Sequence, residues 1–589
     1  MKKIQLILLL VLLAITGQAG AQIIPTTITN GQFDPGTVFY RIKFTYPFFL
    51  KPYITIGSDV TTTTTQAKAT LFAFVGNDTD GYRIYAKGDA TKYIYLTSTT
   101  SDVNVDNVHY GTSDTYDKFK IHTNGKGYTI YQYGPRSSSI PTSLNYVSGS
   151  TLQTWSNSGS LSDNNCRVAF EPVEMSLLYQ YTFSEGTVNQ VVYGTIGSAY
   201  PNATTPAFCT ITGSKPAGNV AAGGVDNASF TATWNGPLDY SSDLANAKWY
   251  LMTLGYQDGH KQVFRYSALN TTINLPTDAY TFTYSSKDQF AFVGNPLDGF
   301  QVINRSAGNP RLVANADGTG NPSFANSPSS SQSDRWDIYD VTQSPHDPIT
   351  VPGEKRFGLN LHGYSAKKLN RSGSSRNVVY WGDHDNGSTF TVSQADLPSL
   401  ALNVFDGKTY ASLYVDYPVQ VTSENVKVYT GTVSGNTLQM TEANDKIIPA
   451  GVGVVLVGNT ASETSAALSI ANSAGTVSHG VIEGSITDVP IGGLQDLYLV
   501  LGVSNEEPQS VGFFQPTVAT IPAYRAYIPK SATQSVRGLY FNFDGETTSI
   551  DPTVLTPAKE ETIYDLSGRR VNKTVKGIYI KNGKKIYVK

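Results

Sequence analysis

A long internal repeat is the feature that most limits how this chain can fold. The segment FAFVGNDTDGYRI, Phe72 to Ile84, returns as FAFVGNPLDGFQV, Phe290 to Val302, 218 positions further along. Such agreement is hard to obtain by chance, and a repeat of this kind predicts two copies of one domain. Matching residues continue on both sides: Phe39-Tyr40-Arg41-Ile42 corresponds to Trp249-Tyr250-Leu251-Met252, Phe119-Lys120-Ile121 to Trp336-Asp337-Ile338, and Leu144-Asn145 with Trp155 to Leu369-Asn370 with Trp381.

A shorter cycle runs inside each copy: an aromatic-x-apolar strand, a Gly turn, a second strand and then a polar stretch. In the first copy the cycle begins at VFYRIKF, at LFAFVGN and at DKFKIHT, and the strand RVAFEPV closes it. Three such cycles predict three hairpin pairs that close a barrel and leave no sheet edge exposed. We therefore expect β-trefoil-like domains at residues 22–175 and 246–397.

The rest of the chain also has the pattern of short strands. Residues 176–245 carry alternating runs such as LLYQYTF and SFTATW between Gly, Pro and Asn, which predicts a small β spacer domain. Residues 398–550 carry YASLYVDYPVQV, GVGVVLVG and DLYLVLGV at close spacing, which is typical of a β-sandwich. The expected fold class is all-β: two trefoil-like domains, a spacer, a C-terminal sandwich and a short β tail.

Composition limits the possible partners. The formal net charge is -3 and charged residues make up only 15% of the chain, so no global field attracts a nucleic-acid backbone or an anionic membrane surface. We expect no nucleic-acid partner. No segment after the N-terminus has 18 uninterrupted apolar residues, so no membrane-spanning helix is expected either.

The N-terminus reads as a secretory signal at residues 1–21. Lys2 and Lys3 precede an apolar run from Ile4 to Ile15, and small residues follow, ending Ala19-Gly20-Ala21. This order of a basic, an apolar and an A-x-A region predicts export, with cleavage after Ala21.

The C-terminus, residues 551–589, begins with a Pro-containing linker and ends TIYDLSGRRVNKTVKGIYIKNGKKIYVK. The residues Tyr564-Asp565-Leu566-Ser567-Gly568-Arg569-Arg570, with KGIYI and NGKK after them, resemble the C-terminal sorting signal of type IX secretion cargo in Gram-negative bacteria. The resemblance covers about the last 30 residues. It implies the type IX machinery as a partner, passage through the outer membrane, and removal of the tail with release or attachment to surface lipopolysaccharide. The expected location is secreted or on the outer surface of the cell.

A second resemblance concerns the repeated domain. Together with the threefold cycle, the segment VVYWGDHDNGSTFTV, Val378 to Val392, is similar to the closing strand pair of ricin-type lectin trefoils in secreted bacterial proteins. This resemblance covers about half of the chain. It implies a trefoil fold and carbohydrate binding.

Sugar binding needs an aromatic face for the ring and a few planar polar groups for the hydroxyls. Asp80 with Tyr82, and Asp298 with Phe300, supply such groups at equivalent places in the two copies, and Trp155 and Trp381 recur as well. These six residues are the candidate ligand-binding residues. Each has a structural alternative, because Asp-Gly is an ordinary hairpin turn and a repeated aromatic residue often belongs to a core.

Signatures of catalysis and metal binding are missing from the sequence. There is no H-E-x-x-H, no Cys pair at zinc spacing, no Walker loop and no G-x-S-x-G. Asp383-His384-Asp385 has groups that ligate metals, but such residues are also ordinary in turns. The expectation is no enzyme, no cofactor and no metal. The two cysteines, Cys166 and Cys209, are expected as separate thiols, with a disulfide as the alternative.

Three functions remain open from the sequence. The first is a secreted or surface-displayed, non-catalytic carbohydrate-binding protein, in which two weak sites on one chain raise avidity. The second is a structural adhesin or surface-layer component that makes protein contacts. The third is an enzyme that acts on glycans.

Overall fold

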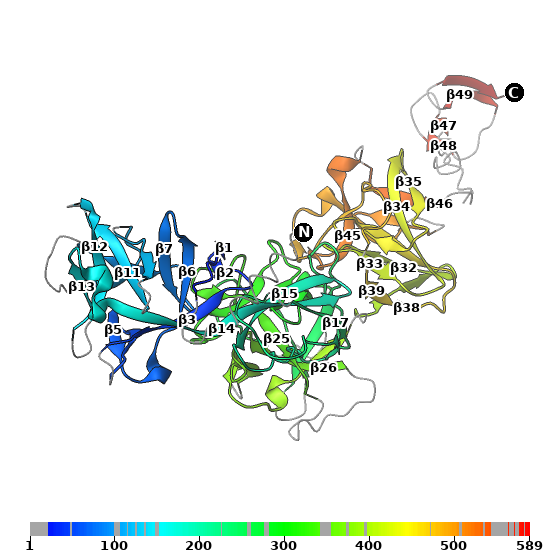
Figure 1. Cartoon of the computed structure of the whole chain (residues 1–589). Helices are drawn as coiled ribbons and strands as arrows, with labels where there is room; N and C mark the ends of the chain where they lie inside the picture. Colours follow the sequence, from blue (N-terminus) through cyan, green and yellow to red (C-terminus); the bar gives the residue numbers. More distant parts are fainter. Residues whose placement is uncertain are drawn as a thin grey trace, which may run out of the picture. The chain divides into compact units, whose positions relative to one another are not determined.

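The computed structural model describes residues 22–543 except 47–49, 99–106, 115, 124–126, 135–136, 148–151, 225–226, 256–260, 276–281, 342–354, 373–375, 394–396, 472, 506–508 and 534–535, and, in the tail, residues 563–564, 570–571, 576–581 and 584–588. The regular structure in these residues consists of β-strands and short 3-10 turns (Figure 1). The predicted all-β class is therefore confirmed. The described part of the chain holds no helix of the length and apolarity that a membrane crossing requires.

The chain divides into two compact units. The first comprises Met1–Gly236 with Asn295–Asp298, and the second comprises Pro237–Gly294 with Gly299–Lys589. The first unit contains the first copy of the repeat, and the second unit contains the second copy apart from residues 295–298.

The first copy forms a barrel-like sheet. Strands β3, β6, β7, β10, β11 and β14 pair in that order, and β14 pairs back onto β3, which closes the ring. Three hairpins, β4-β5, β8-β9 and β12-β13, project from the ring. The strands are β3 (Val38–Phe44), β4 (Tyr53–Ile56), β5 (Val60–Thr63), β6 (Phe72–Asn77), β7 (Gly81–Ala86), β8 (Tyr93–Leu96), β9 (Val108–Gly111), β10 (Lys120–Thr123), β11 (Tyr128–Gly134), β12 (Ser137–Tyr146), β13 (Leu152–Ser156) and β14 (Arg167–Phe183).

The second copy repeats this pattern. Strands β18, β20, β21, β25, β26 and β29 pair in that order, and β29 returns to β18. Its strands are β18 (Tyr250–Gly255), β19 (Lys261–Val263), β20 (Gln289–Asn295), β21 (Gly299–Asn304), β22 (Arg311–Asn315), β23 (Ser323–Ala325), β24 (Gln332–Ser333), β25 (Trp336–Tyr339), β26 (Lys355–Leu361), β27 (Lys368–Arg371), β28 (Val378–Trp381) and β29 (Phe390–Ser393). Hairpins β22-β23 and β27-β28 project from this ring.

Strand register agrees with the residue matches seen in the sequence. Tyr40 lies opposite Phe72 in the first copy, and Tyr250 lies opposite Phe290 in the second. Further round each ring, Tyr82 lies opposite Phe119, and Phe300 opposite Trp336. The two copies therefore place matched residues at matched positions of the same pairing scheme. Nearly all of these side chains are fully buried, which is why the aromatic-x-apolar pattern recurs.

The segment expected as a separate spacer is continuous with the first barrel. Strand β14 runs through the expected boundary at residue 175 and continues to Phe183. Its second half pairs with β15 (Gly186–Thr195) and with β17 (Ala228–Trp234), and β17 pairs with β16 (Cys209–Gly213). One hydrophobic core contains residues of both regions, such as Phe170 and Tyr181. In the structure, the strands of this region extend the sheet of the first copy.

The residues after 398 form several sheets. A ten-stranded sheet comprises β31 (Asn403–Phe405), β32 (Lys408–Leu413), β37 (Val454–Gly458), β34 (Val426–Ser434), β35 (Thr437–Glu442), β46 (Gly538–Phe543), β43 (Val511–Phe514), β42 (Tyr498–Val503), β45 (Arg525–Pro529) and β40 (Glu483–Ser485) in this order. A three-stranded sheet comprises β36 (Ile447–Ile448), β33 (Val419–Val421) and β39 (Leu468–Ile470). Val419 and Leu468 from the small sheet share a core with Val428 and Leu456 from the large one. The tail forms β47 (Ile563–Tyr564), β48 (Arg570–Val571), β49 (Gly577–Lys581) and β50 (Lys584–Val588).

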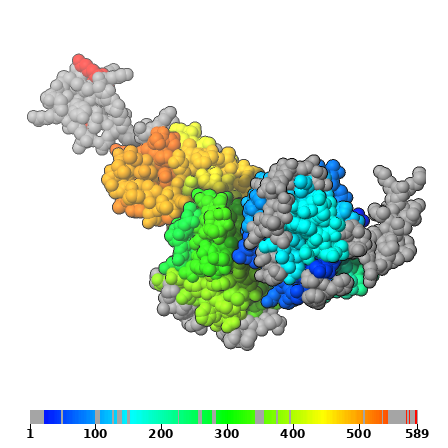
Figure 2. All heavy atoms as spheres, turned by 60° about the vertical axis from the view of Figure 1, so that its left-hand side comes forward, coloured from blue at the N-terminus to red at the C-terminus, as the bar shows by residue number. Residues whose placement is uncertain are grey.

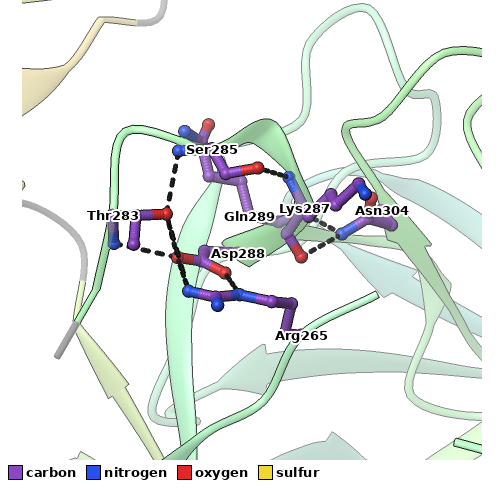
Figure 3. A network of polar contacts seen from close by, with 7 residues as sticks. All are labelled: Arg265, Thr283, Ser285, Lys287, Asp288, Gln289 and Asn304. Atoms are coloured by element: carbon purple, nitrogen blue, oxygen red, sulfur yellow. Dashed lines mark hydrogen bonds and ion pairs between the residues drawn. The ribbon is translucent and has the colours of Figure 1, made fainter. Parts of the chain in front are cut away.

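Buried polar contacts fix the entry into β20 of the second copy. The Asp288 carboxylate is fully buried and pairs with the Arg265 guanidinium, whose Nη2 lies 2.8 Å from Oδ2. Thr283 donates to the same carboxylate through its backbone N–H and its hydroxyl. Ion pairing with Asp288 raises the pKa of Arg265. Figure 3 shows this network with Ser285, Lys287, Gln289 and Asn304, whose amide donates to the carbonyls of Lys287 and Gln289.

The same region contacts the residues after 398. Ser286 Oγ donates to Asp416 Oδ2 at 2.9 Å. The Arg305 guanidinium lies over the rings of Trp249 and Tyr417, with its carbon 4.9 and 5.1 Å from the two centroids. Burial lowers the pKa of Arg305 to about 10. Figure 2 shows the atoms of the second copy in green and those of the residues after 398 in yellow to orange.

Candidate functional site

The predicted aspartates lie in the tight turns of two matched hairpins. Asp80 is exposed between β6 and β7, and its Oδ2 accepts a hydrogen bond from Asn77 Nδ2 at 2.9 Å. Asp298 is exposed between β20 and β21, and Asn295 Nδ2 donates to its Oδ2 at 3.0 Å. The side-chain oxygen of each asparagine also accepts two backbone N–H bonds of its own turn. The structure therefore gives both aspartates a turn-stabilising contact.

The aromatic partners proposed with them are buried. Tyr82 is 4% exposed and Phe300 is 1% exposed. Tyr82 packs edge-on to Phe74 and donates its hydroxyl to Asp78, while Phe300 packs against Phe292 and Tyr240. Stacking on a sugar requires an accessible ring face, and neither side chain presents one in this structure.

The two tryptophans occupy matched positions at the outer strands of the third hairpins. Trp155 on β13 lies opposite Ser143 of β12, and Trp381 on β28 lies opposite Lys368 of β27. Trp155 is partly buried, whereas Trp381 is 53% exposed. Of the six candidates, Trp381 is the one whose aromatic ring is largely open to solvent.

A polar row leads from Trp381 across four strands. Asp337 of β25 lies opposite Asn360 of β26, Asn360 lies opposite Lys368 of β27, and Lys368 lies opposite Trp381 of β28. Directly opposed residues of antiparallel strands point to the same face of a sheet. At an interstrand spacing of about 4.8 Å, the row spans about 14 Å. We call these four residues the β25–β28 row.

The members of the row are held by hydrogen bonds. Asn360 Nδ2 donates to Asp337 Oδ2 at 3.2 Å, and Asp337 Oδ1 lies 2.6 Å from Nδ1 of His362. Lys368 Nζ donates to the backbone carbonyls of Ser365 and Gly382, both at 2.9 Å. The Asp337 side chain keeps a third of its surface exposed. The row therefore offers a hydrogen-bonded carboxylate, an anchored ammonium and an exposed tryptophan.

Asp383-His384-Asp385 follows Trp381 directly. The two ring nitrogens of His384 lie 3.1 Å from the Tyr339 hydroxyl and 3.2 Å from Thr389 Oγ1. Asp385 Oδ1 accepts from Asn370 Nδ2 at 2.5 Å. Burial raises the pKa of Tyr339 strongly, so its hydroxyl stays protonated. These contacts anchor the loop onto β25 and β27. In the part of the chain that the structure describes, no group of three or more His, Cys, Asp or Glu side chains is placed to hold a metal ion.

Strand register also shows that the barrel does not require a tryptophan here. Each hairpin has a row of opposed residues that starts on the adjoining ring strand, three residues after the first paired aromatic residue of that strand. The last residue of this row is the position that matches Trp381. In the other hairpins whose register the structure describes, this position holds Thr63, Gly111 and Ala325. Small or polar residues therefore serve equally well at this place in the fold.

The first copy carries a different row at the same register. Lys120 lies opposite Tyr131, Tyr131 opposite Ser143, and Ser143 opposite Trp155. Gln153, two residues before Trp155, completes a Gln-x-Trp triplet of the kind that ricin-type repeats often carry. Sequence reasoning missed Gln153, and it missed Asp337, Asn360 and Lys368 as neighbours of Trp381. The triplet itself was a usable signal for Gln153, whereas the row becomes visible only from the register of four strands.

The remaining predicted residues fall elsewhere. Cys166 is buried, Cys209 is partly buried, and both are free thiols, as expected. Tyr564 of β47 lies opposite Arg570 of β48. The other residues named for sorting and cleavage lie outside the described residues: Ala19, Ala21, Asp565, Leu566, Gly568 and Arg569.

Comparisons with known proteins show no family for this chain. No protein-family model matches the chain, and no curated protein matches it. One solved structure that matches is described as "Structure and mode of action of a mosquitocidal holotoxin". The match has 11% identity and a TM-score of 0.20, and it covers 71% of this chain and 57% of that one. A likeness at this TM-score carries no argument about fold or function.

Proposed function

We propose that this protein binds glycans without catalysis, and that the β25–β28 row of the second copy is a principal binding site. The observation that carries the proposal is Trp381, which is 53% exposed at a position where other hairpins hold Thr, Gly or Ala. An exposed indole offers a ligand a large apolar face that is open to solvent. A sugar ring suits it, because the C–H face stacks on the indole while hydroxyls bond to nearby polar groups.

The rest of the row supports a ligand with several hydroxyl groups. The Asp337 carboxylate is an acceptor that remains partly exposed, and its orientation is set by Asn360 and His362. The Lys368 ammonium is held by two carbonyls and lies over the Tyr339 ring, and Lys368 is the strand neighbour of Trp381. Preset polar groups lose little conformational freedom on binding. We further propose that both copies are β-trefoils, which fits six-strand rings with projecting hairpins.

A glycan array tests the function. The mature chain is compared with Trp381→Ala and with Tyr46→Ala, which removes another exposed aromatic residue, 42% exposed, in the first copy. We expect binding to a subset of glycans, weakened at least tenfold by Trp381→Ala and unchanged by Tyr46→Ala. Absence of binding by the mature chain at high density would refute the proposal. A stable protein partner that added sugars do not displace would instead favour the structural adhesin.

We propose in addition that the chain is exported and that its tail directs type IX secretion to the medium or the cell surface. The motif from Tyr564 to Arg570 and the N-terminal signal support this. A reporter fused to residues 551–589 should reach the surface or the medium in a host with this system. Retention in the periplasm would contradict the assignment, and Arg569→Ala with Arg570→Ala serves as the matched control.

A further inference from the structure

The third segments of the two copies differ sharply in charge. From Lys118 to Ser162 the first copy carries four basic residues, Lys118, Lys120, Lys126 and Arg136, and no Asp or Glu. The corresponding stretch of the second copy, from Arg335 to Ser388, carries seven basic and six acidic residues. The two copies share the strand pairing of this segment but not its electrostatic character.

The charge difference also affects the rows that end at the two tryptophans. Lys120 occupies the register position at which the second copy has Asp337. His122 lies two residues further along β10 and so points to the same face as Lys120, and Lys118 is exposed just before the strand begins. At the other end of the row is Trp155, at the position of Trp381. The first copy thus combines a cation and a tryptophan where the second combines a carboxylate and a tryptophan.

The cations of this face are not neutralised by the acids nearest in sequence. Asp117 pairs with Arg83 Nε at 2.5 Å, and Asp114 pairs with Nη2 of the same arginine at 3.2 Å. Among the described residues, Lys118 and Lys120 form no ion pair, and Asp163 accepts a backbone N–H within its own turn. A partner with negative charge would therefore meet uncompensated positive charge here.

We infer that the two copies bind different classes of glycan. Lys120 and Trp155, at the two ends of a row whose middle residues Tyr131 and Ser143 are buried, take an acidic, carboxylated or sulfated sugar, and the β25–β28 row takes a neutral one. This inference rests on the proposed function. The ammonium of Lys120 pairs with the acidic group while the partly exposed Trp155 packs against the sugar ring. In the second copy, Asp337 repels an acidic sugar from the same position, which gives the selectivity.

Titration calorimetry with matched polymer pairs tests the inference. The full mature chain carrying Trp381→Ala, which removes the proposed neutral site, is titrated with polygalacturonate and with its methyl-esterified, neutral form, and then with dextran sulfate and dextran. We expect the acidic polymers to bind at least tenfold more tightly than their neutral partners, and to weaken as NaCl rises from 50 to 300 mM, because exposed charges are screened. Equal binding of each acidic and neutral pair would overturn the inference.

Variants assign the site. Lys120→Glu should weaken binding of the acidic polymers at least tenfold, and Trp155→Ala should weaken it as well. Lys92→Glu makes the same charge change on the β7–β8 turn of this copy and should have no effect. If Lys120→Glu behaves like Lys92→Glu, or if Trp381→Ala abolishes acidic binding, the inference is wrong. Lys120→Glu leaves the core untouched, so its result does not depend on whether Trp155→Ala folds.

The two proposals fail in distinguishable ways. Loss of neutral-glycan binding in Trp381→Ala, with no acidic binding by the parent chain, would overturn the inference and keep the proposed function. Absence of both neutral and acidic binding would overturn both. Anionic phospholipid vesicles are included as a separate arm. Vesicle binding that Lys120→Glu removes, without any polymer binding, would assign the basic face to a membrane surface and overturn the inference.

Discussion

Replacing Trp336 and Trp381 by alanine, one at a time, should separate a core tryptophan from a surface tryptophan of the same barrel. Trp336 on β25 is fully buried, and Trp381 on β28 is 53% exposed. The two side chains lie on opposite faces, because Trp336 stacks on Tyr380, the residue before Trp381. The comparison therefore tests whether Trp381 serves the fold or the surface.

The magnitudes follow from these surroundings. Truncating a fully buried tryptophan costs about 3–5 kcal/mol, and Trp336→Ala also leaves the Leu312 carbonyl without its indole donor, now at 2.8 Å, which costs about 1 kcal/mol more. Trp381→Ala removes a ring that already keeps over half of its surface in water, so at most about 1 kcal/mol is expected. Trp336→Phe should cost about 1–2 kcal/mol, because Phe119 fills the matched position of the first copy.

Hydrogen exchange read by mass spectrometry suits a chain of several units, because it reports each strand separately. The amides of β26 (Lys355–Leu361) pair with β25 and report opening of this barrel. Trp336→Ala should speed their exchange by at least about a hundredfold, since 1.4 kcal/mol is a factor of ten. Trp381→Ala should change it by less than about fivefold. Equal acceleration by both variants would make Trp381 a structural residue and would remove the main support for the proposed site.

Further expectations concern stability and thiols. Asp288→Ala should destabilise the second unit by about 3–5 kcal/mol, because it leaves the Arg265 charge partly buried and unpaired; a loss under about 1 kcal/mol in urea unfolding would contradict this. Burial alone would raise the pKa of Asp59, but bonds from His109 and from two backbone N–H groups lower it. The stabilising effect of the Asp59 carboxylate is thus present above about pH 4 and is lost as the pH falls further. Asp59→Asn should therefore reduce the loss of stability at acid pH. An unchanged loss would argue against the Asp59–His109 pair. Burial raises the pKa of Cys209 to about 11 and that of Cys166 further. Ellman's reagent at pH 8 should therefore react slowly with the native chain and detect two thiols after unfolding. A disulfide between the two cysteines would leave no thiol to detect.

Much of the architecture was accessible from the sequence because its signals are local and repeated. The aromatic-x-apolar strands predict buried ring strands, and the matched pairs Tyr40–Phe72 and Tyr250–Phe290 show that the repeat extends to register. The spacer boundary was less accessible. The sequence of β14 carries no signal at residue 175, where the strand changes from one pairing partner to another. A continuous strand of 17 residues was therefore interpreted as two separate strands.

The candidate site was predictable only in part. Asp-Gly-aromatic trios looked like binding groups, but turn chemistry uses the aspartate and core packing uses Tyr82 and Phe300. Trp381 was recognisable from the repeat, whereas its neighbours are not. Asp337 and Trp381 are 44 residues apart in the sequence, and they share a row only because four strands pair in one register. Such a row depends on non-local pairing, which a single sequence does not encode in any local pattern.

The residues at matched positions of the two copies limit the roles that the two rows can have. If the fold itself demanded a tryptophan at the end of the third hairpin, the ring would be buried and the matched positions of the other hairpins would be large; they are Thr63, Gly111 and Ala325. Each tryptophan lies at one end of a four-residue row and a charged side chain lies at the other, with Lys120 in one copy and Asp337 in the second. A shared aromatic position with opposite charges is what two sites for related ligands of different charge require, and exchanging the charges, Lys120→Asp and Asp337→Lys, should exchange the preference for acidic polymers between the copies.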